Sequence, residues 1–140
     1  LGAYTGPITV YYGDEWGAYV DGYTGNGSLG AYNDNAARTT GKISGFDTNQ
    51  QALHDYAAKV MAARAANEAL WNGTCTPLSS ESSFYAVKKT SGSNIVVVLM
   101  NSGSSSVTYS VGSAGTDLIN GGTTSSSVTV PAYTAMFIKL

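Results

Sequence analysis

The chain has 140 residues, of which 43% are hydrophobic and 11% charged, and its formal net charge is −2 at pH 7. This length allows one modest core or two small pieces packed together, and the seven Lys and Arg residues are too few and scattered for a nucleic-acid surface or a polybasic membrane anchor. Ten Tyr, two Trp and abundant Gly, Ser, Thr and Asn favour neutral polar ligands such as sugars, and the same composition describes an ordinary secreted β-protein.

The first predicted element is a short strand at Pro7 to Tyr12. Its sequence, PITVYY, is a nearly continuous β-branched and aromatic run between two glycines. Such a run is typical of a strand that is buried on both faces, as in parallel sheets. A long loop rich in Gly, Asn and Asp follows from Asp14 to Phe46. A loop of this length in a compact domain is usually either functional or wrongly assigned, and we favour a functional role here.

A helix is predicted from about Asn49 to Leu70. Thr48 and Gln51 fit a capping box at its start, and Gly73 stands where a helix would end. Apolar positions recur at three- and four-residue spacing, which predicts a core-facing stripe. The residues of this stripe are Leu53, Tyr56, Ala57, Val60, Met61 and Arg64. His54 lies off the stripe, so we expect it to face solvent.

The remainder, Thr74 to Leu140, predicts an antiparallel β-domain. Short runs such as NIVVVLMN, SVTYSV and AMFIKL are separated by Gly- and Ser-rich turns, which is the spacing of a small sandwich or barrel. The longest apolar run, Ile95 to Met100, is far shorter than the roughly 20 residues of a membrane helix. The single cysteine, Cys75, cannot form an internal disulfide, and we interpret it as structural.

Three motifs in order resemble one known family. They are YYGDE at Tyr11 to Glu15, NDNAAR ending at Arg38, and KVMAARAANEALWNG from Lys59 to Gly73, followed by a β-domain that ends in PAYTAMFIKL. Together they resemble the C-terminal end of an α-amylase-family glycoside hydrolase. The chain departs from that pattern at Thr9 and at Glu68, where the family usually has proline, which leaves the subfamily open.

The resemblance implies a two-part fold. Residues 1–73 would be the end of a (β/α)8 catalytic barrel, with Pro7 to Tyr12 as its eighth strand, the Asp14 to Phe46 loop above it, and its eighth helix. Residues 74–140 would be the β-sandwich called domain C. The expected fold class is therefore an α/β fragment followed by an all-β antiparallel sandwich. Active sites of such barrels lie on the loops after the strands, so the long loop would face the substrate cleft.

No catalytic residue is assigned to this chain. Retaining glycosidases use two carboxylates about 5 Å apart, and in the resembled family these come from earlier strands, upstream of Leu1. Asp14 and Glu15 are adjacent, and neighbouring strand residues point to opposite faces, so they cannot flank one bond. We expect a structural role for Glu15.

No metal or cofactor is assigned either. The side chains of Asn33 to Asn35 are too few for the six to eight oxygen ligands that calcium requires. Calcium in the complete enzyme stays open, with no site for it identified in this chain.

Substrate contact is the role that we predict for the long loop. An aromatic ring offers a flat apolar face to a sugar, and an arginine can donate to sugar hydroxyls. The candidate substrate-binding residues are Trp16, Tyr19, Tyr23, Tyr32 and Arg38. The alternative is that these side chains only pin the loop onto its own barrel.

Three functions are therefore open. The leading hypothesis is the C-terminal portion of a hydrolase acting on starch or maltooligosaccharides, which contributes a cleft wall and a stabilising domain and is inert alone. Its partners would be an α-glucan and the remainder of the barrel, as an upstream segment or a separate chain, without nucleic acid or membrane. The alternatives are a non-catalytic carbohydrate-binding module and a structural or interaction domain. An extracellular location is expected, with any signal peptide upstream.

Overall fold

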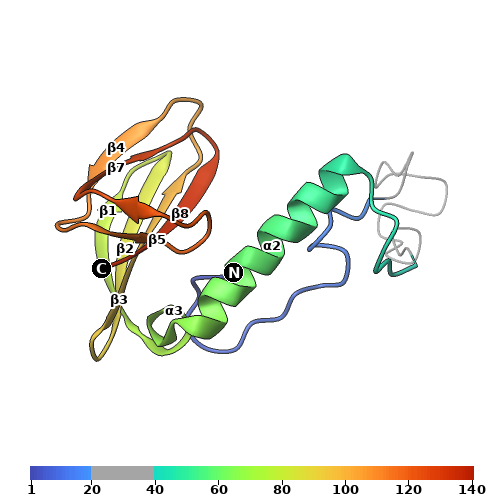
Figure 1. Ribbon diagram of the computed structural model, residues 1–140, viewed down its shortest axis with the longest axis horizontal. Helices are drawn as coiled ribbons and strands as arrows, with labels where there is room; N and C mark the ends of the chain where they lie inside the picture. Colours follow the sequence, from blue (N-terminus) through green and yellow to red (C-terminus); the bar gives the residue numbers. More distant parts are fainter. Residues whose placement is uncertain (20–39) are drawn as a thin grey trace. The chain divides into compact units, whose positions relative to one another are not determined.

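The computed structural model describes residues 1–19 and 40–140. The chain divides into two compact units (Figure 1). The first combines Leu1–Ile8 with Lys59–Leu140, and the second runs from Thr9 to Ala58. The boundary near Gly73 that the sequence suggests separates secondary-structure types rather than compact units, and it stays a prediction. No helix among the described residues is long and apolar enough to cross a membrane.

The predicted antiparallel β-domain is confirmed, and Figure 1 shows its strands gathered together. Two sheets form it, one of six strands in the order β1-β2-β3-β8-β5-β6 and one of two strands, β4-β7. All of the pairings are antiparallel. The strands are β1 (Thr74–Ser80), β2 (Phe84–Ser91), β3 (Asn94–Asn101), β4 (Val107–Ser110), β5 (Gly115–Asp117), β6 (Thr123–Thr124), β7 (Ser127–Val130) and β8 (Thr134–Lys139).

The central strand β3 is buried on both faces. Val96 and Val98 belong to a core cluster that includes Ala63 and Leu70 from the helices. Val97 and Leu99 belong to a second cluster, which includes residues of the small sheet such as Val128 and Val130. Because successive strand residues point to opposite faces, the unbroken apolar run of β3 fills both clusters at once.

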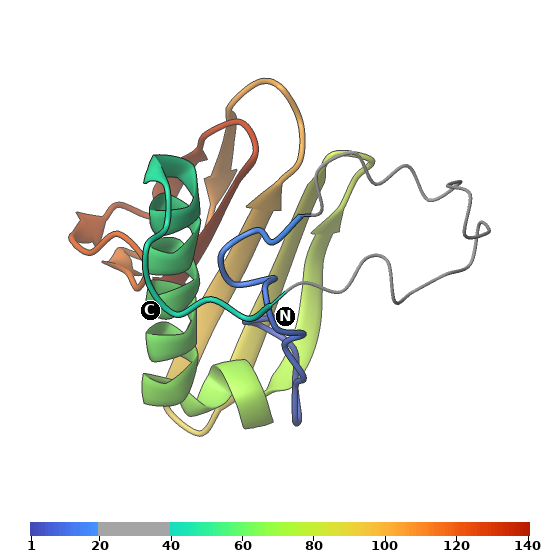
Figure 2. The same ribbon diagram turned by 90° about the vertical axis from the view of Figure 1, so that its right-hand side faces the viewer.

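The helical cover consists of two helices instead of the predicted one. α2 runs Thr48–Ala66 and α3 runs Glu68–Asn72. The C-terminal end of α2 and α3 lie against one face of the large sheet (Figure 2). Gly73 ends α3, as predicted, and its N–H donates to the Ala69 carbonyl at 3.2 Å.

The predicted continuous helix from Asn49 to Leu70 is wrong at Asn67, which has an extended backbone. The buried Asn67 side chain donates to the Ala63 carbonyl at 2.8 Å and accepts from the Asn94 amide at 3.3 Å. Asn94 in turn accepts from the Ala69 N–H at 2.9 Å. This amide network binds the helix break to the start of β3, and it satisfies polar groups that would otherwise be buried without partners.

The start of α2 is also displaced from the predicted capping box of Thr48 and Gln51. Asp47 is the cap, because its Oδ1 accepts from the N–H groups of Asn49 and Gln50, both at 2.9 Å. Gln50 reciprocates by accepting from the Asp47 N–H at 3.2 Å. The box is therefore formed one residue earlier, with a charged cap that also favours the positive end of the helix dipole.

One member of the predicted core stripe, Val60, is found against a core, whereas Met61 and Arg64 line an open groove. Val60 packs against the cluster that contains Ala63. Leu53 and Tyr56 are exposed, so the prediction that they lie in a core is wrong for this chain. Both precede Lys59, so they belong to the second unit and not to the first, which contains the buried core clusters.

The predicted strand at Pro7 to Tyr12 is not formed. This segment has no strand pairing, and Val10, Tyr11 and Tyr12 are exposed. A strand of the parallel type needs neighbouring strands on its edges and cover on its faces. None of the eight strands found in the described residues pairs with it.

Leu99→Ala should lower the free energy of unfolding by about 2–5 kcal/mol, because it leaves a cavity between the two sheets. Met100 is the matched control, since it follows on the same strand but is 43% exposed, whereas Leu99 is 0% exposed. Met100→Ala should cost less than about 1 kcal/mol. Urea denaturation of the two variants measures both values, and equal losses would contradict burial of β3 on the Leu99 face.

Candidate functional site

The second unit contains an aromatic cluster, which we define as Trp16, Lys42, Phe46 and His54. The Trp16 and Phe46 ring centroids are 5.9 Å apart, and the planes are tilted by 35°. Phe46 stacks on His54 with a centroid distance of 5.0 Å. The cluster therefore joins residues of the loop to the first turns of α2.

Tight turns before Trp16 hold the ring in place. The Gly13 carbonyl accepts from the N–H groups of Trp16, at 3.2 Å, and Ala18, at 2.8 Å. Gly13 has φ of +97°, which favours glycine. Glu15 Oε2 accepts from the Gly13 N–H at 2.8 Å. The Glu15 carboxylate thus stabilises the turn, which agrees with the structural role expected for it.

Lys42 lies against both large rings of the cluster. Its Nζ is 5.6 Å from the Trp16 ring centroid and 5.5 Å from that of Phe46. Both distances are in the range of cation–π attraction. The same ammonium donates to Gln50 Oε1 at 3.0 Å, and so ties the loop to the first turn of α2.

Two ring nitrogens of the cluster are buried without a hydrogen-bond partner in the described structure. They are Nε1 of Trp16 and Nδ1 of His54. His54 Nδ1 is 3.7 Å from Asp55 Oδ1, which is too far for a hydrogen bond. The indole nitrogen of Trp16 can only donate. A ligand that completes this cluster would therefore bring an acceptor to Trp16.

The structure places two of the predicted sugar contacts. Trp16 is buried, with 6% of its surface exposed, whereas Tyr19 is 71% exposed. Among the described residues, these two rings do not contact each other. Tyr23, Tyr32 and Arg38 lie outside the described residues. All five assignments stay predictions.

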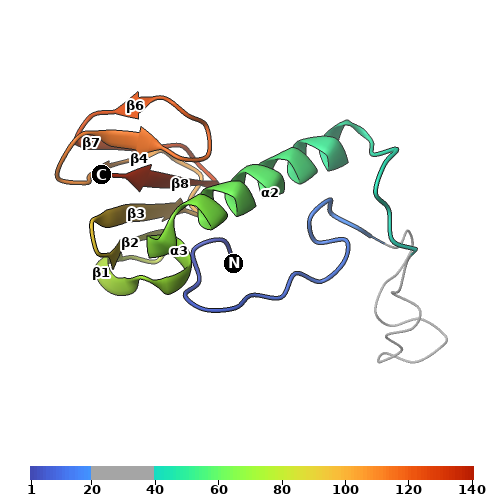
Figure 3. The same cartoon turned by 60° about the horizontal axis from the view of Figure 1, so that its bottom comes forward.

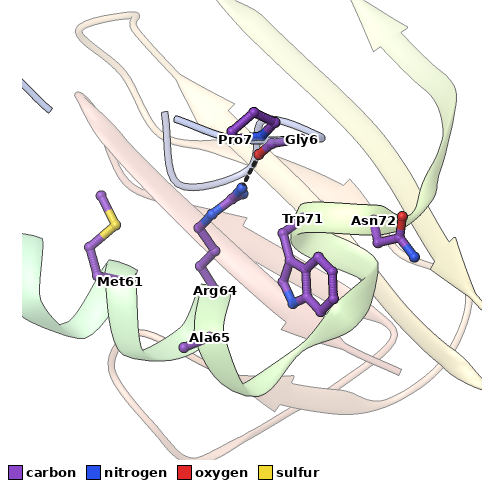
Figure 4. Close-up of a pocket in the computed structure, with 7 residues that line it drawn as sticks. All are labelled: Gly6, Pro7, Met61, Arg64, Ala65, Trp71 and Asn72. Carbon is purple, nitrogen blue, oxygen red and sulfur yellow. Dashed lines mark hydrogen bonds between the residues drawn. The ribbon is translucent and has the colours of Figure 1, made fainter. Parts of the chain in front are cut away.

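The first unit has an open groove beside its N-terminal segment, which we define as Leu1–Gly6. The groove has a volume of about 540 Å³ and is shown in Figure 4. Arg64 points across it and donates to carbonyl oxygens of the N-terminal segment: Gly2 at 3.4 Å, Tyr4 at 2.6 Å, and Gly6. It also donates to the Leu70 carbonyl at 3.2 Å. Arg64 is therefore an anchor for the N-terminal segment, not a free donor for a ligand.

Lys89 of β2 holds the same segment from the other side. It is 1% exposed, and its Nζ donates to the Ala3 carbonyl at 2.6 Å, Thr5 Oγ1 at 2.6 Å and the Leu70 carbonyl at 3.0 Å. Figure 3 shows the N-terminal segment beside α3 and the end of α2. By composition alone, Lys89 is one of seven scattered Lys and Arg residues. Strand alternation was the available signal, since it places Lys89 on the same face as Val87.

Burial lowers the pKa of Lys89 below its ordinary value of 10.5, because the charged form loses water. The Cys75 thiol lies opposite Lys89 in the pairing of β1 with β2 and opposes this shift in pKa. The nearby Arg64 guanidinium adds to the lowering.

No group of three or more His, Cys, Asp or Glu side chains within residues 1–19 and 40–140 is arranged to hold a metal ion. Asp14 is exposed, and Glu15 is engaged by the turn before Trp16. The described residues thus offer an aromatic surface and a backbone anchor rather than a pair of facing carboxylates.

Comparison with known proteins finds the fold in amylases. No protein-family model matches the chain, and no curated protein matches it. Solved structures do match. AmyP, in complex with maltotriose and with maltose, superposes with a TM-score of 0.86 and 23% identity over 99% of this chain. An α-amylase of Anoxybacillus superposes with a TM-score of 0.66 and 20% identity. The match covers 79% of this chain and 26% of that amylase.

A similar but weaker match is the isomaltulose synthase of Klebsiella sp. LX3, with a TM-score of 0.53 and 22% identity; the match covers 62% of this chain and 17% of that enzyme. The chain spans about one third of the AmyP chain, since the match covers 32% of it. At these identities the comparisons show the fold. The predicted resemblance is thereby confirmed at the level of the fold, because a helix followed by an antiparallel β-domain matches the C-terminal portion of amylases.

Lys89→Met should remove a pH dependence from the stability. Because the pKa of Lys89 is lowered in the folded state, the unfolded chain binds this proton more tightly, and burial costs stability until the pH rises toward 10.5. The wild type should therefore gain unfolding free energy relative to Lys89→Met between neutral pH and about pH 10. Urea denaturation at both pH values measures the difference.

Lys88→Met is the control for this prediction. Lys88 is the preceding residue of β2 and points to the opposite face. This variant should keep the same gain with rising pH as the wild type. A parallel pH profile for wild type and Lys89→Met would contradict the assignment of a lowered pKa to Lys89.

Proposed function

We propose that this chain is the C-terminal portion of an α-amylase-family glycoside hydrolase acting on starch or maltooligosaccharides. The observation that carries the proposal is the match of 99% of the chain to AmyP, a protein crystallised with maltose and maltotriose. The order and spacing of the three sequence motifs support the same conclusion. The activity belongs to the whole enzyme, so the remainder of the barrel is the first partner that we propose.

The first unit would stabilise the enzyme. Its central strand β3 is buried on both faces, and Lys89 and Arg64 hold the segment that leads toward Pro7. In the proposed enzyme this segment would enter the eighth barrel strand. The β-domain would therefore support the barrel through backbone contacts, which do not depend on the substrate.

The second unit would supply part of the cleft wall. Trp16 and Tyr19 are the described aromatic candidates, and Tyr23, Tyr32 and Arg38 complete the proposed set. We further propose an extracellular location, where starch would be accessible.

The isolated chain should not release reducing sugar from starch, because we propose that the two catalytic carboxylates of a retaining glycosidase lie in the remainder of the barrel. It should bind maltotriose weakly in isothermal titration calorimetry. Tyr19→Ala should weaken this binding by about three- to tenfold, as expected for loss of one aromatic contact. Tyr133 is the matched control, since it is also strongly exposed but lies in the β-domain.

Starch hydrolysis that persists after exclusion of contaminating amylase would contradict the proposal. Weaker binding in Tyr133→Ala together with unchanged binding in Tyr19→Ala would remove the loop from the sugar site. Such a result would favour a sugar-binding β-domain.

A further inference from the structure

The Lys42 ammonium lies over the Trp16 ring. Lys42 places its ammonium within 5.6 Å of the Trp16 centroid and 5.5 Å of the Phe46 centroid. We propose that Lys42 closes the sugar-binding face of Trp16, and that a neutral sugar displaces it. This inference rests on the proposed sugar contact of Trp16. It adds that Lys42 must leave the ring before the sugar can bind.

The contacts of Lys42 suit a removable cover. Besides the two rings, its Nζ donates to the Gln50 side chain at 3.0 Å. Lys42 is partly exposed, and it forms no ion pair with an acidic side chain in the described parts of the chain. A flexible lysine ammonium regains water when it leaves, so displacement exchanges these contacts for hydration instead of leaving a buried charge.

A second, independent observation points to a ligand at this position. Nε1 of Trp16 is buried and has no hydrogen-bond partner in the described structure. Buried donors are nearly always satisfied, so this N–H requires an explanation. A hydroxyl oxygen of a bound ligand would accept from it.

The two observations together define the ligand chemistry. The ligand must offer a flat apolar face to the indole ring and a hydroxyl acceptor at its edge. A glucose unit of a maltooligosaccharide has both. A cationic ligand is disfavoured, because the displaced ammonium of Lys42 stays near the site.

The first test measures whether Lys42 covers the ring. Trp71→Phe leaves Trp16 as the only tryptophan, since the chain has two. In this background, Lys42→Ala should raise the acrylamide quenching constant of Trp16 about twofold, because it removes the side-chain stem. Lys42→Met keeps an apolar stem of similar length and should leave the quenching near the wild-type value. Lys59→Ala controls for the loss of a lysine at an exposed helix position.

The second test measures whether the cover competes with sugar. Lys42→Ala should bind maltotriose about three- to tenfold more tightly than the wild type, since no side chain has to be displaced. Adding Trp16→Phe to Lys42→Ala should abolish most of that gain, because phenylalanine has no N–H donor. Unchanged quenching, or unchanged or weaker affinity, in Lys42→Ala would overturn the proposal and make Lys42 a loop anchor only.

A measurement on the wild type remains decisive if Lys42→Ala does not fold. Saturation with maltotriose should shift the side-chain amide resonances of Gln50 in an NMR spectrum, because Lys42 leaves Gln50 Oε1. Sugar binding without that shift would overturn the proposal that sugar displaces Lys42. If sugar binds without that shift and Tyr19→Ala still weakens binding, the proposed function stands without the role of Lys42. If neither the wild type nor any variant binds maltotriose, both the sugar contact of Trp16 and the role of Lys42 are refuted.

Discussion

The burial of β3 on both faces is the constraint on which the first unit depends. Val96 and Val98 need cover on one side of the sheet, and Val97 and Leu99 need it on the other. A single sheet cannot provide both covers. The chain meets this requirement with α3 and the end of α2 on one face, and with the β4-β7 sheet on the other. The β-domain and the helices that cover it therefore share one core, although the sequence pattern changes from helical to β-rich at Gly73.

One carbonyl oxygen connects this core to the N-terminal segment. The Leu70 carbonyl accepts from both Arg64 and Lys89, and each of these cations also binds carbonyl oxygens of the segment. Neither cation pairs with an acidic side chain in the described part of the chain. Backbone oxygens thus solvate two charges, one of them buried in β2. Removal of either cation would leave several carbonyls with fewer donors, so the segment and the sheet are energetically coupled.

Much of this fold was predictable from local pattern. The β-rich runs, the helix and its end at Gly73 follow from spacing and turn residues. The break at Asn67 was not predictable, because it depends on Asn94, which is distant in sequence. The helix start was displaced by one residue, since Asp47 and Thr48 can both cap a helix and the sequence does not rank them. The Pro7 to Tyr12 run has the composition of a strand, but a strand requires partners that composition cannot supply.

Of the candidate site, only Trp16 was among the site residues predicted from the sequence, and its contacts were not predictable. Aromatic residues in a long loop indicated a sugar surface, and Trp16 was among them. The position of Lys42 over its ring had no sequence signal, because a lysine in a polar loop is ordinarily solvated. For Lys89, strand alternation indicated the face of the sheet but not the burial, which depends on the N-terminal segment packing over it. Long-range contacts therefore determine which side chains of this chain are available to a ligand.

Hydrogen exchange of the isolated chain, read by mass spectrometry, tests the central claim most directly. The claim is that the β-domain has its own buried core, whereas Pro7 to Tyr12, which has the composition of a strand, pairs with none of the eight strands in the described residues. Amides of Val96 to Leu99 should exchange only through global unfolding, and those of Ile8 to Tyr12 should exchange on the order of 100-fold faster or more. Comparable protection of the two segments would contradict the account, because Pro7 to Tyr12 would then be paired in a sheet.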